Sequence, residues 1–498
     1  MKKVLQHTPL FLFLLPVFFV LHGYAENYGY ITLANCLLLT VTYTGAAALI
    51  YFLFSLFYKN YLKAALLATY LMAFFCFYGA VHDFLKQYSG FLYKYSVLLP
   101  AFLLGAVWLG IYLRKTKHLF FKATLFINVL LLIYILVDGG SVIWKALNPG
   151  PNRLSVYSFA KDNHYDTCKE CPKPDIYFLL FDEYSSSVSL KEKYHYDNSD
   201  LDSFLIGNGF HIQALSRGNY NFTPFSMSSI LNMSYLQGIG NPEACTAEDY
   251  AYCTNLIRDN EVIKFLSFQG YDIINYSVFD LAGNPSRVEQ SFLPLKTKLI
   301  TDRTLFSRVK KDIGWMLYTG KFRIKWLTEH TLFQQIENNN KFISLTERES
   351  EVKAARPRFV YMHVYMPHEP FYFDRNGRPK DEATVYRENT ETVIQPYLDY
   401  IPYTNGRIRE LISTIRKNTD GNAVIVFMGD HGYRYTSYEK HPNHHFQNQN
   451  AVYFPDRDYH LFYDSITGVN QFRVVFNKLF NQKIPLLKDS TIFLRDRK

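Results

Sequence analysis

Charged side chains are scarce in the first 147 residues of this 498-residue chain, whereas the remainder has the composition of a soluble globular domain. This scarcity excludes an ordinary water-soluble fold for the first part. The chain also lacks internal repeats and low-complexity tracts, which argues against a repeat architecture. Its net charge of +9 comes partly from loops between apolar runs, so it does not indicate a nucleic-acid partner.

Long apolar runs occupy the charge-poor part. Most approach or exceed the roughly 20 residues that a helix needs to cross a hydrocarbon core of about 30 Å. The first run is short, but no small-residue cleavage site follows it, so we interpret it as a retained helix and not a signal peptide. The runs are Pro9–Tyr24, Tyr30–Phe57, Ala64–Val81, Tyr95–Tyr112 and Leu119–Trp144. They predict an N-terminal bundle of five transmembrane helices in residues 1–147.

Basic residues are distributed unevenly between the loops. One set of loops carries Lys2, Lys3, Lys59, Lys63, Arg114, Lys115, Lys117 and Lys122, and the alternate loops carry only Lys86 and Lys94. Because cytoplasmic loops are enriched in Lys and Arg, this pattern predicts a cytoplasmic N-terminus. An odd number of spans then places everything after Trp144 outside. The expected location is the cytoplasmic (inner) membrane, with an extracytoplasmic or periplasmic domain.

The chain has only six cysteines, and four of them lie beyond the apolar part. Cys168 and Cys171 form one close pair, and Cys245 and Cys253 form another. In an oxidising compartment, close pairs predict two local disulfides. A zinc site built from the same four thiolates is the alternative.

The outer part alternates between strand and helix signals. Turn-forming residues at 148–173 predict a linker, and residues 174–498 predict one catalytic domain. Strands are expected at 210–214, 272–277, 358–364 and 423–428, and helices at 201–208, 225–236, 262–269 and 404–418. Residues 281–356 are charged and irregular, and we assign them as an insert. The alternation predicts an α/β domain with a doubly wound, mostly parallel sheet.

Two apolar segments end abruptly in acidic residues. Val424–Met428 leads into Gly429-Asp430-His431-Gly432, and an apolar segment beginning at Pro174 ends in Asp182-Glu183. The carboxyl ends of parallel strands are where α/β folds place their sites. Asp430 and His431 can bind one metal ion if the chain turns sharply, which the flanking glycines permit. The alternative is a strand end with an incidental histidine.

Thr223 begins a predicted apolar helix within Thr223-Pro-Phe-Ser226. Taken alone, it is most simply an N-cap residue with Pro224 at the first helical position. A helix N-terminus also favours anions, and a metal-bound threonine hydroxyl is a possible nucleophile towards phosphorus. The two interpretations are compatible.

Five histidines lie in or after the strands expected at 358–364 and 423–428. His363 is most simply a structural residue. His368 and one of His441, His444 and His445 are better candidates for a second metal site or for phosphate contacts. Their spacing does not decide which of the three contributes.

Together these motifs resemble the membrane-anchored transferases of the alkaline phosphatase/sulfatase superfamily, in particular phosphoethanolamine transferases and lipoteichoic acid synthases. The resemblance covers the layout of the whole chain and is specific at the acid-ended strand, at Thr223 and Ser226, and at Asp430-His431-Gly432. It implies a sulfatase-like outer domain that binds Zn²⁺, or Mn²⁺. The implied metal ligands are Glu183 with Asp182 beside it, Thr223, Asp430 and His431. Thr223 is the implied nucleophile and His368 the implied substrate-side catalytic residue.

The chain departs from these families in two ways. Cysteines bracket the threonine motif in phosphoethanolamine transferases, and none does so here. No basic or glycine-rich feature marks a glycerol-phosphate site. A formylglycine sulfatase is excluded because Phe222 and Ser226 stand where the motif Cys/Ser-x-Pro-x-Arg requires Cys or Ser and Arg.

The sequence therefore predicts an enzyme that transfers a phospholipid head group, of the phosphoethanolamine or phosphoglycerol type, through a phospho-threonine intermediate. The donor is a phospholipid, and the acceptor is a glycan or lipid of the cell envelope. Membrane spans support a lipid donor because they hold the site near the membrane surface. The alternatives are a membrane-bound metal-dependent phosphodiesterase and, from another class, a catalytically idle sensor or scaffold.

Overall fold

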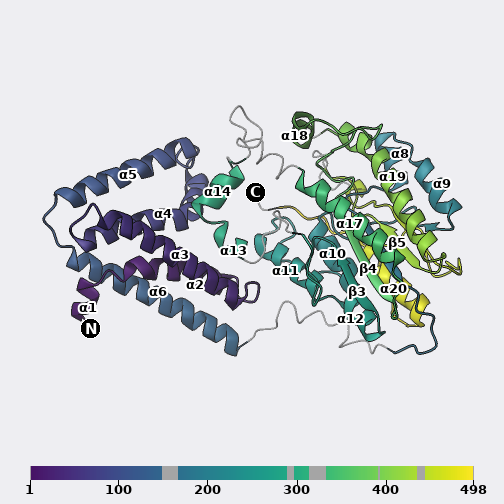
Figure 1. Ribbon diagram of the computed structural model, residues 1–498, viewed down its shortest axis with the longest axis horizontal. Coiled ribbons are helices and arrows are strands. Elements are labelled where there is room, and N and C mark those ends of the chain that lie inside the picture. Colours follow the sequence, from purple (N-terminus) through teal and green to yellow (C-terminus); the bar gives the residue numbers. More distant parts are fainter. Residues whose placement is uncertain are drawn as a thin grey trace. The chain divides into compact units, whose positions relative to one another are not determined.

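The structure is a computed structural model that describes residues 2–148, 166–288, 297–312, 314, 333–390, 393–434 and 443–496. The chain forms two compact units. The membrane unit comprises residues 1–152 with 294–320, and the catalytic unit comprises 153–293 with 321–498 (Figure 1). Within the second segment of the membrane unit, the described residues 297–312 pack with the N-terminal helices.

The membrane unit is a bundle of apolar helices. Four of them are long and apolar enough to cross a membrane: α3 (Leu33–Ser55), α4 (Tyr61–Tyr88), α5 (Tyr95–Lys115) and α6 (Phe121–Leu147). The helix α2 (Phe11–Glu26) is apolar but has only 16 residues, and it follows the short α1 (Lys2–His7). All five predicted runs are thus helical, and four of them reach spanning length.

The helices α2, α4 and α6 run in the same direction. At their starting end, Asn128 of α6 donates to the backbone oxygens of Leu5 and Thr8, each at 2.8 Å. At the other end, Lys145 of α6 donates to the carbonyl of Ala25. These contacts hold α6 beside α1 and α2.

Two short helices from the predicted insert pack on the finishing ends of α2 and α4: α13 (Lys298–Thr301) and α14 (Leu305–Asp312). Gly79 of α4 donates its N–H to Arg303 O at 2.8 Å, and a Cβ at Gly79 would lie 2.7 Å from that oxygen. Arg303 pairs with Glu26 at 2.9 Å, and Arg308 pairs with Asp83. Only a glycine lets the insert's backbone approach α4 this closely.

The catalytic unit is built on a six-stranded mixed sheet in the order β2-β6-β5-β1-β4-β3. The strands are β1 (Ile176–Phe181), β2 (His211–Ile212), β3 (Asp272–Tyr276), β4 (Arg358–Val364), β5 (Val424–Met428) and β6 (Asn450–Tyr453). β3, β4, β1 and β5 are parallel, and β6 and β2 are antiparallel to their neighbours. β1, β4 and β5 are buried throughout, which accounts for the continuous apolar sequences of β1 and β5; β4 also contains Arg358 and His363.

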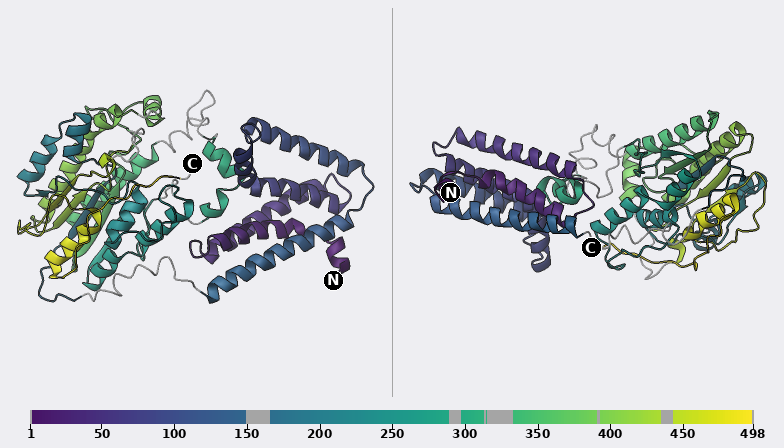
Figure 2. Two further views of the ribbon diagram at one scale, coloured as in Figure 1. Left: turned by 180° about the vertical axis from the view of Figure 1, so that it is seen from behind. Right: turned by 90° about the horizontal axis from the view of Figure 1, so that it is seen from below.

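Helices cover both faces of the sheet (Figures 1 and 2). One group packs together as α10 (Thr223–Asn232), α11 (Ala247–Arg258), α12 (Glu261–Phe268) and α20 (Gly468–Phe480). The other contains α9 (Ser199–Gly207), α17 (Gln334–Glu351) and α19 (Gln395–Asn418), with α8 (Ser187–Tyr194) and α18 (Glu382–Thr390) nearby in Figure 1. The arrangement is the expected doubly wound one, with antiparallel strands at one edge.

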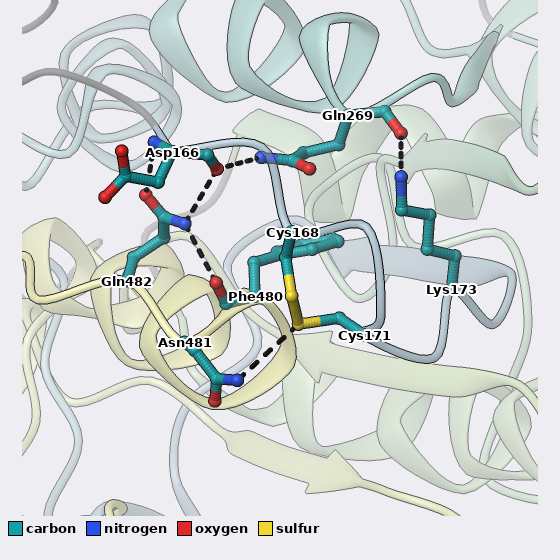
Figure 3. Close-up of a disulfide and its surroundings, with 8 residues drawn as sticks. All are labelled: Asp166, Cys168, Cys171, Lys173, Gln269, Phe480, Asn481 and Gln482. Atoms are coloured by element: carbon teal, nitrogen blue, oxygen red, sulfur yellow. Dashed lines mark hydrogen bonds between the residues drawn. A yellow bond between two sulfur atoms is a disulfide. The ribbon is translucent and has the colours of Figure 1, made fainter.

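A disulfide joins Cys168 and Cys171 where the chain enters the catalytic unit (Figure 3). Beside it, the carbonyl of Asp166 accepts from Gln269 and Gln482, which lie just beyond α12 and α20. The first predicted disulfide is confirmed, and it lies in a segment that connects the ends of two helices to the start of β1.

The second predicted disulfide is wrong, because Cys245 and Cys253 are both free and buried. Cys253 lies on α11, which begins at Ala247. The helix carries Cys253 about 9 Å past its first residue, whereas disulfides need Cα atoms within about 7 Å. The alternative cysteine zinc site is also absent from the described residues, whose candidate metal groups contain no cysteine.

Candidate active site

The candidate site lies at the carboxyl edge of the three central strands. β1 pairs with β4 on one side and with β5 on the other, so the residues that follow β1 and β5 meet at one edge. Such a point, where the strand order reverses, is the usual place for a ligand in an open α/β sheet. The sheet thereby brings Asp182 and Asp430 together although 248 positions separate them in the sequence.

Close backbone approaches shape this edge. A Cβ at Gly218 would lie 2.3 Å from Asp430 O, and one at Gly432 would lie 2.2 Å from His444 O. Glu183 has a φ of 61°, in the left-handed region that non-glycine residues seldom adopt. This turn accompanies a divergence of the Asp182 and Glu183 carboxylates, which belong to two different groups of side chains.

The first group consists of Thr223, Asp182, Asp430 and His431. The Thr223 hydroxyl lies 3.2 Å from Asp182 Oδ2 and 3.3 Å from His431 Nε2. His431 Nε2 is also 3.2 Å from Asp430 Oδ2. Asp182, Asp430 and His431 are fully buried. The residue preceding Thr223, Phe222, is the helix N-cap, and the threonine hydroxyl points to these side chains instead of capping α10.

Several observations show that this group fits a divalent metal. His431 Nδ1 lies 2.9 Å from Gly432 O, so it donates there and leaves the Nε2 lone pair directed at the carboxylates. Asp430 Oδ2 and Glu183 Oε2 are buried oxygens without a hydrogen-bond partner among the described residues. Buried charges are normally paired or coordinate metals. Imidazole and carboxylate donors suit Zn²⁺, and carboxylate-rich sets also accept Mn²⁺.

Burial shifts the ionisation of these groups. Burial and the neighbouring Asp430 charge raise the pKa of Asp182 to about 8. Burial raises the pKa of Glu183 to about 7, although His368 and Arg434 oppose this change. Burial holds the pKa of His431 well below its usual range, so the imidazole is neutral and able to bind a metal.

The second group consists of Glu183, His368, Glu369 and Arg434. Arg434 donates its backbone N–H to Glu183 Oε1 at 2.9 Å, and its Nε lies 3.3 Å from the same oxygen. His368 Nε2 lies 3.9 Å from Glu183 Oε2, and His368 Nδ1 lies 2.8 Å from Glu369 O. Burial lowers the pKa of His368, but Glu369, Glu183 and Asp182 outweigh it and raise that pKa to about 9.

His363 was predicted to be structural, and the structure places it against Asp182. Its Nε2 lies 3.1 Å from Asp182 Oδ2, and Tyr361 OH lies 2.9 Å from its Nδ1. Burial lowers the pKa of His363 to about 4, so the ring is neutral. The tyrosine hydroxyl then donates to Nδ1, and Nε2–H donates to the carboxylate. The sequence offered only the position of His363 near the end of an expected strand, because the pairing of β4 with the strand that ends in Asp182 is decided by the fold.

Of the remaining predicted histidines, the two that the structure describes are not among the residues of the first or the second group. His444 and His445 lie in a short 3₁₀ helix (η1, Asn443–His445), and the His445 carbonyl accepts from Gly432 N. The ring of His444 packs near Tyr194, and that of His445 near Phe493. Neither ring belongs to the candidate metal groups of the described residues. His441 lies outside the described residues.

Arg434 and Glu369 were absent from the predicted site. Arg434 lies only three residues after His431, and Glu369 follows His368 directly. The sequence spacing gave no reason to assign these two charged residues to the site, because their contacts depend on which side chains the loops bring together.

Comparison with known proteins supports the expected superfamily. Residues 328–472, which include β4, β5 and the Asp430-His431 pair, match the sulfatase family model. No curated protein matches the chain significantly in sequence. The match confirms the resemblance to the alkaline phosphatase/sulfatase superfamily in this segment.

Solved structures similar to this chain come from several bacteria. The C-terminal periplasmic domain of EptC from Escherichia coli, in complex with Zn, shares 10% identity with a TM-score of 0.38 over 63% of this chain and 84% of that chain. The corresponding domain of the phosphoethanolamine transferase EptC from Campylobacter jejuni shares 12% identity with a TM-score of 0.38 over 64% and 92%. The phosphonate monoester hydrolase of Agrobacterium radiobacter shares 10% identity with a TM-score of 0.39 over 62% and 74%.

Proposed function

We propose that this protein is a metal-dependent phosphotransferase of the cytoplasmic membrane, with an extracytoplasmic catalytic unit. It moves a phospholipid head group of the phosphoethanolamine or phosphoglycerol type to a glycan or lipid acceptor. The observation that carries the proposal is the position of the Thr223 hydroxyl between Asp182 and His431, in a group that includes the buried Asp430 Oδ2, which has no hydrogen-bond partner among the described residues. A hydroxyl in this setting is suited to nucleophilic attack and is poorly explained as a helix cap.

Each residue has a distinct role in the proposed reaction. Asp182, Asp430 and His431 would hold Zn²⁺ or Mn²⁺ together with Thr223, and Glu183, whose carboxylate lies with His368 and Glu369, would be a further ligand. The bound metal would supply Lewis-acid activation, lowering the pKa of the threonine hydroxyl and polarising the phosphodiester. Asp182 orients that hydroxyl by accepting its hydrogen bond.

The reaction proceeds in two balanced steps. In the first, the Thr223 hydroxyl loses its proton, a bond forms between Oγ1 and phosphorus, the bond from phosphorus to the diacylglycerol oxygen breaks, and that oxygen takes up a proton. In the second, an acceptor hydroxyl loses its proton and bonds to phosphorus, the bond from phosphorus to Thr223 Oγ1 breaks, and Oγ1 regains a proton. His368 lies beside Glu183 and is the residue proposed to carry these protons.

The apolar helices support a lipid donor. Four of them are long enough to span a bilayer, and a phospholipid substrate is concentrated at that surface. The residues around Thr223 support a threonine nucleophile and not formylglycine, because Phe222 occupies the position of the residue that would be converted.

A labelled phospholipid assay tests this function. The full-length protein, purified in detergent with Zn²⁺, is incubated with phospholipid labelled in its head group, with and without envelope extracts as acceptors. Transfer predicts labelled acceptor and diacylglycerol, together with a phosphate adduct on the tryptic peptide 218–258. Release of the head group into water alone would instead establish the phosphodiesterase. Absence of any lipid turnover by metal-loaded protein would refute both enzymes.

A further inference from the structure

Arg434 is held through both its backbone and its side chain, although it lies outside the predicted ligands. Its backbone N–H is bound by Glu183, and the preceding residue, Tyr433, donates its N–H to Ser185 Oγ. Its guanidinium stacks over the ring of Phe222, with 5.2 Å between Cζ and the ring centroid. The side chain nevertheless remains 19% exposed, so a ligand can reach it.

The guanidinium contacts the elements that carry the proposed chemistry. Nε lies 3.3 Å from Glu183 Oε1, Nη1 lies 3.4 Å from Asn221 O, and Nη2 lies 3.2 Å from His368 Nε2. Asn221 and Phe222 directly precede Thr223. Arg434 thus lies where the nucleophile's loop, the Glu183 carboxylate and the catalytic histidine converge.

The charges of the site show why a cation is needed there. Asp182, Glu183, Asp430 and Glu369 offer four carboxylates around the two groups. Even with His368 protonated, one divalent metal does not balance four ionised carboxylates, and a phosphodiester brings a further negative charge. Such a site would repel its substrate, because charges interact strongly where water is excluded. A guanidinium removes one charge and matches the geometry of phosphoryl oxygens.

We propose that Arg434 binds a non-bridging oxygen of the substrate's phosphoryl group and so makes this carboxylate-rich site accept an anionic phosphodiester. It supplies positive charge beside Glu183, His368 and Glu369, a group that could otherwise hold a second metal ion. This inference rests on the proposed function, since it names the substrate contact of the same site.

Substitution of Arg434 tests the inference in the full-length protein loaded with Zn²⁺. The probes are inorganic phosphate, measured by calorimetric binding, and bis(4-nitrophenyl) phosphate, measured by turnover. Arg434→Gln should weaken phosphate binding and raise KM by about 10- to 100-fold, as expected for losing a charge-assisted contact. Arg434→Lys should lie between this variant and the wild type, because it keeps the charge but loses the planar fork.

Arg409 offers a matched control. Its guanidinium also stacks over a phenylalanine, Phe204, and pairs with the carboxylate of Asp200, but it lies on the surface of α19. Arg409→Gln should leave phosphate binding and KM unchanged. Zinc content and the thermal unfolding midpoint are measured for every variant.

The outcomes separate this inference from the proposed function. Unchanged phosphate binding and KM in Arg434→Gln would overturn it. The inference would also be overturned if Arg434→Gln bound less zinc but its zinc-loaded fraction bound phosphate as tightly as the wild type. Arg434 would then only position Glu183. If the wild type turns over no phosphodiester, the proposed function fails, while the phosphate-binding measurement still decides whether Arg434 holds the anion.

Discussion

At the scale of single residues, the candidate site combines the proposed nucleophile, the proposed metal ligands and the side chains that contact them. Thr223 is informative because its hydroxyl contacts Asp182 and His431 and not the backbone of its own helix. The competing explanation, that the threonine is an N-cap, is therefore not supported by the geometry. The two explanations also differ in the stability that a substitution would cost.

Thr223→Ala should abolish phosphodiester turnover while leaving the fold and most of the metal affinity intact. Asp182, Asp430 and His431 remain as ligands, and no capping hydrogen bond is lost. The thermal midpoint should therefore change little, and Thr223→Ser should retain some activity because it keeps an oxygen nucleophile. Turnover by Thr223→Ala at the wild-type rate would make the nucleophile a water molecule and the enzyme a hydrolase.

His363 should tune metal affinity without binding the metal itself. His363→Phe removes the donor to Asp182 Oδ2, and loss of such an orienting partner typically weakens metal binding about 10- to 100-fold. Competition with a chelator of known affinity measures the change. The matched control is His460→Phe, since His460 also contacts an aspartate, Asp458, but is exposed. Equal affinities for the two variants would contradict an orienting role for His363.

Metal affinity should depend steeply on pH. In the metal-free protein the pKa of Asp182 is about 8 and that of Glu183 about 7, so both carboxyls must lose protons before binding a metal. Affinity should fall about tenfold per pH unit below 8 and about a hundredfold per unit below 7. Calorimetric titration between pH 6 and pH 9 measures this slope.

The same shifts determine the stability of the metal-free protein. Because the folded pKa of Asp182 exceeds its usual value, folding retains a proton that the unfolded chain releases. The contribution of Asp182 to the free energy of unfolding is therefore fully present below the usual carboxyl pKa. It is lost as the pH rises to about 8. A metal-free protein that becomes more stable between pH 5 and pH 8 would count against these shifts.

At the scale of elements, three parallel strands and the start of one helix form the site. β1 lies between β4 and β5, and α10 brings Thr223 to the same edge. In the membrane unit, the insert helices α13 and α14 are held against α2 and α4 by Gly79 and by ion pairs at Glu26 and Asp83. The insert helices approach the backbone of α4 closely at Gly79, so the methyl group of an alanine at this position should disturb their packing.

Gly79→Ala should loosen the insert. The new Cβ would lie 2.7 Å from Arg303 O, and neither backbone can yield easily. Limited trypsin digestion should cut the basic segment 298–311 about tenfold faster, corresponding to a loss of about 1.4 kcal/mol in local stability. Gly139→Ala, where a Cβ meets nothing within 4 Å, is the control. Equal digestion rates for both variants would show that the docking does not depend on Gly79.

At the scale of the whole molecule, topology decides which compartment the catalytic unit faces. A reporter fused after Lys145 should indicate an extracytoplasmic location, and one fused between Arg114 and Lys117 should indicate the cytoplasm. The reason is the excess of Lys and Arg in alternate loops. A cytoplasmic signal from a fusion at Lys498 would refute both the orientation and a lipid donor on the outer surface.

The sequence alone was enough for features that depend on local pattern. Apolar runs predicted the five helices α2 to α6, and the acid-ended strands predicted β1 and β5 with Asp182, Glu183, Asp430 and His431 at their ends. Periodicity and strand ends are encoded by neighbouring residues, so they can be read without the fold. The Cys168–Cys171 disulfide was predictable for the same reason, since three positions separate its cysteines.

Only the tertiary structure decided which distant residues meet. It separated Glu183 from Asp182 into different groups, placed His363 behind Asp182 and brought Arg434 to His368. It also left Cys245 and Cys253 unbonded, because Cys253 lies inside α11 and Cys245 lies before that helix begins. These outcomes depend on strand order, on a left-handed turn at Glu183 and on the lengths of helices. Each of these is settled by packing across the whole domain, where burial of the central strands outweighs local preference.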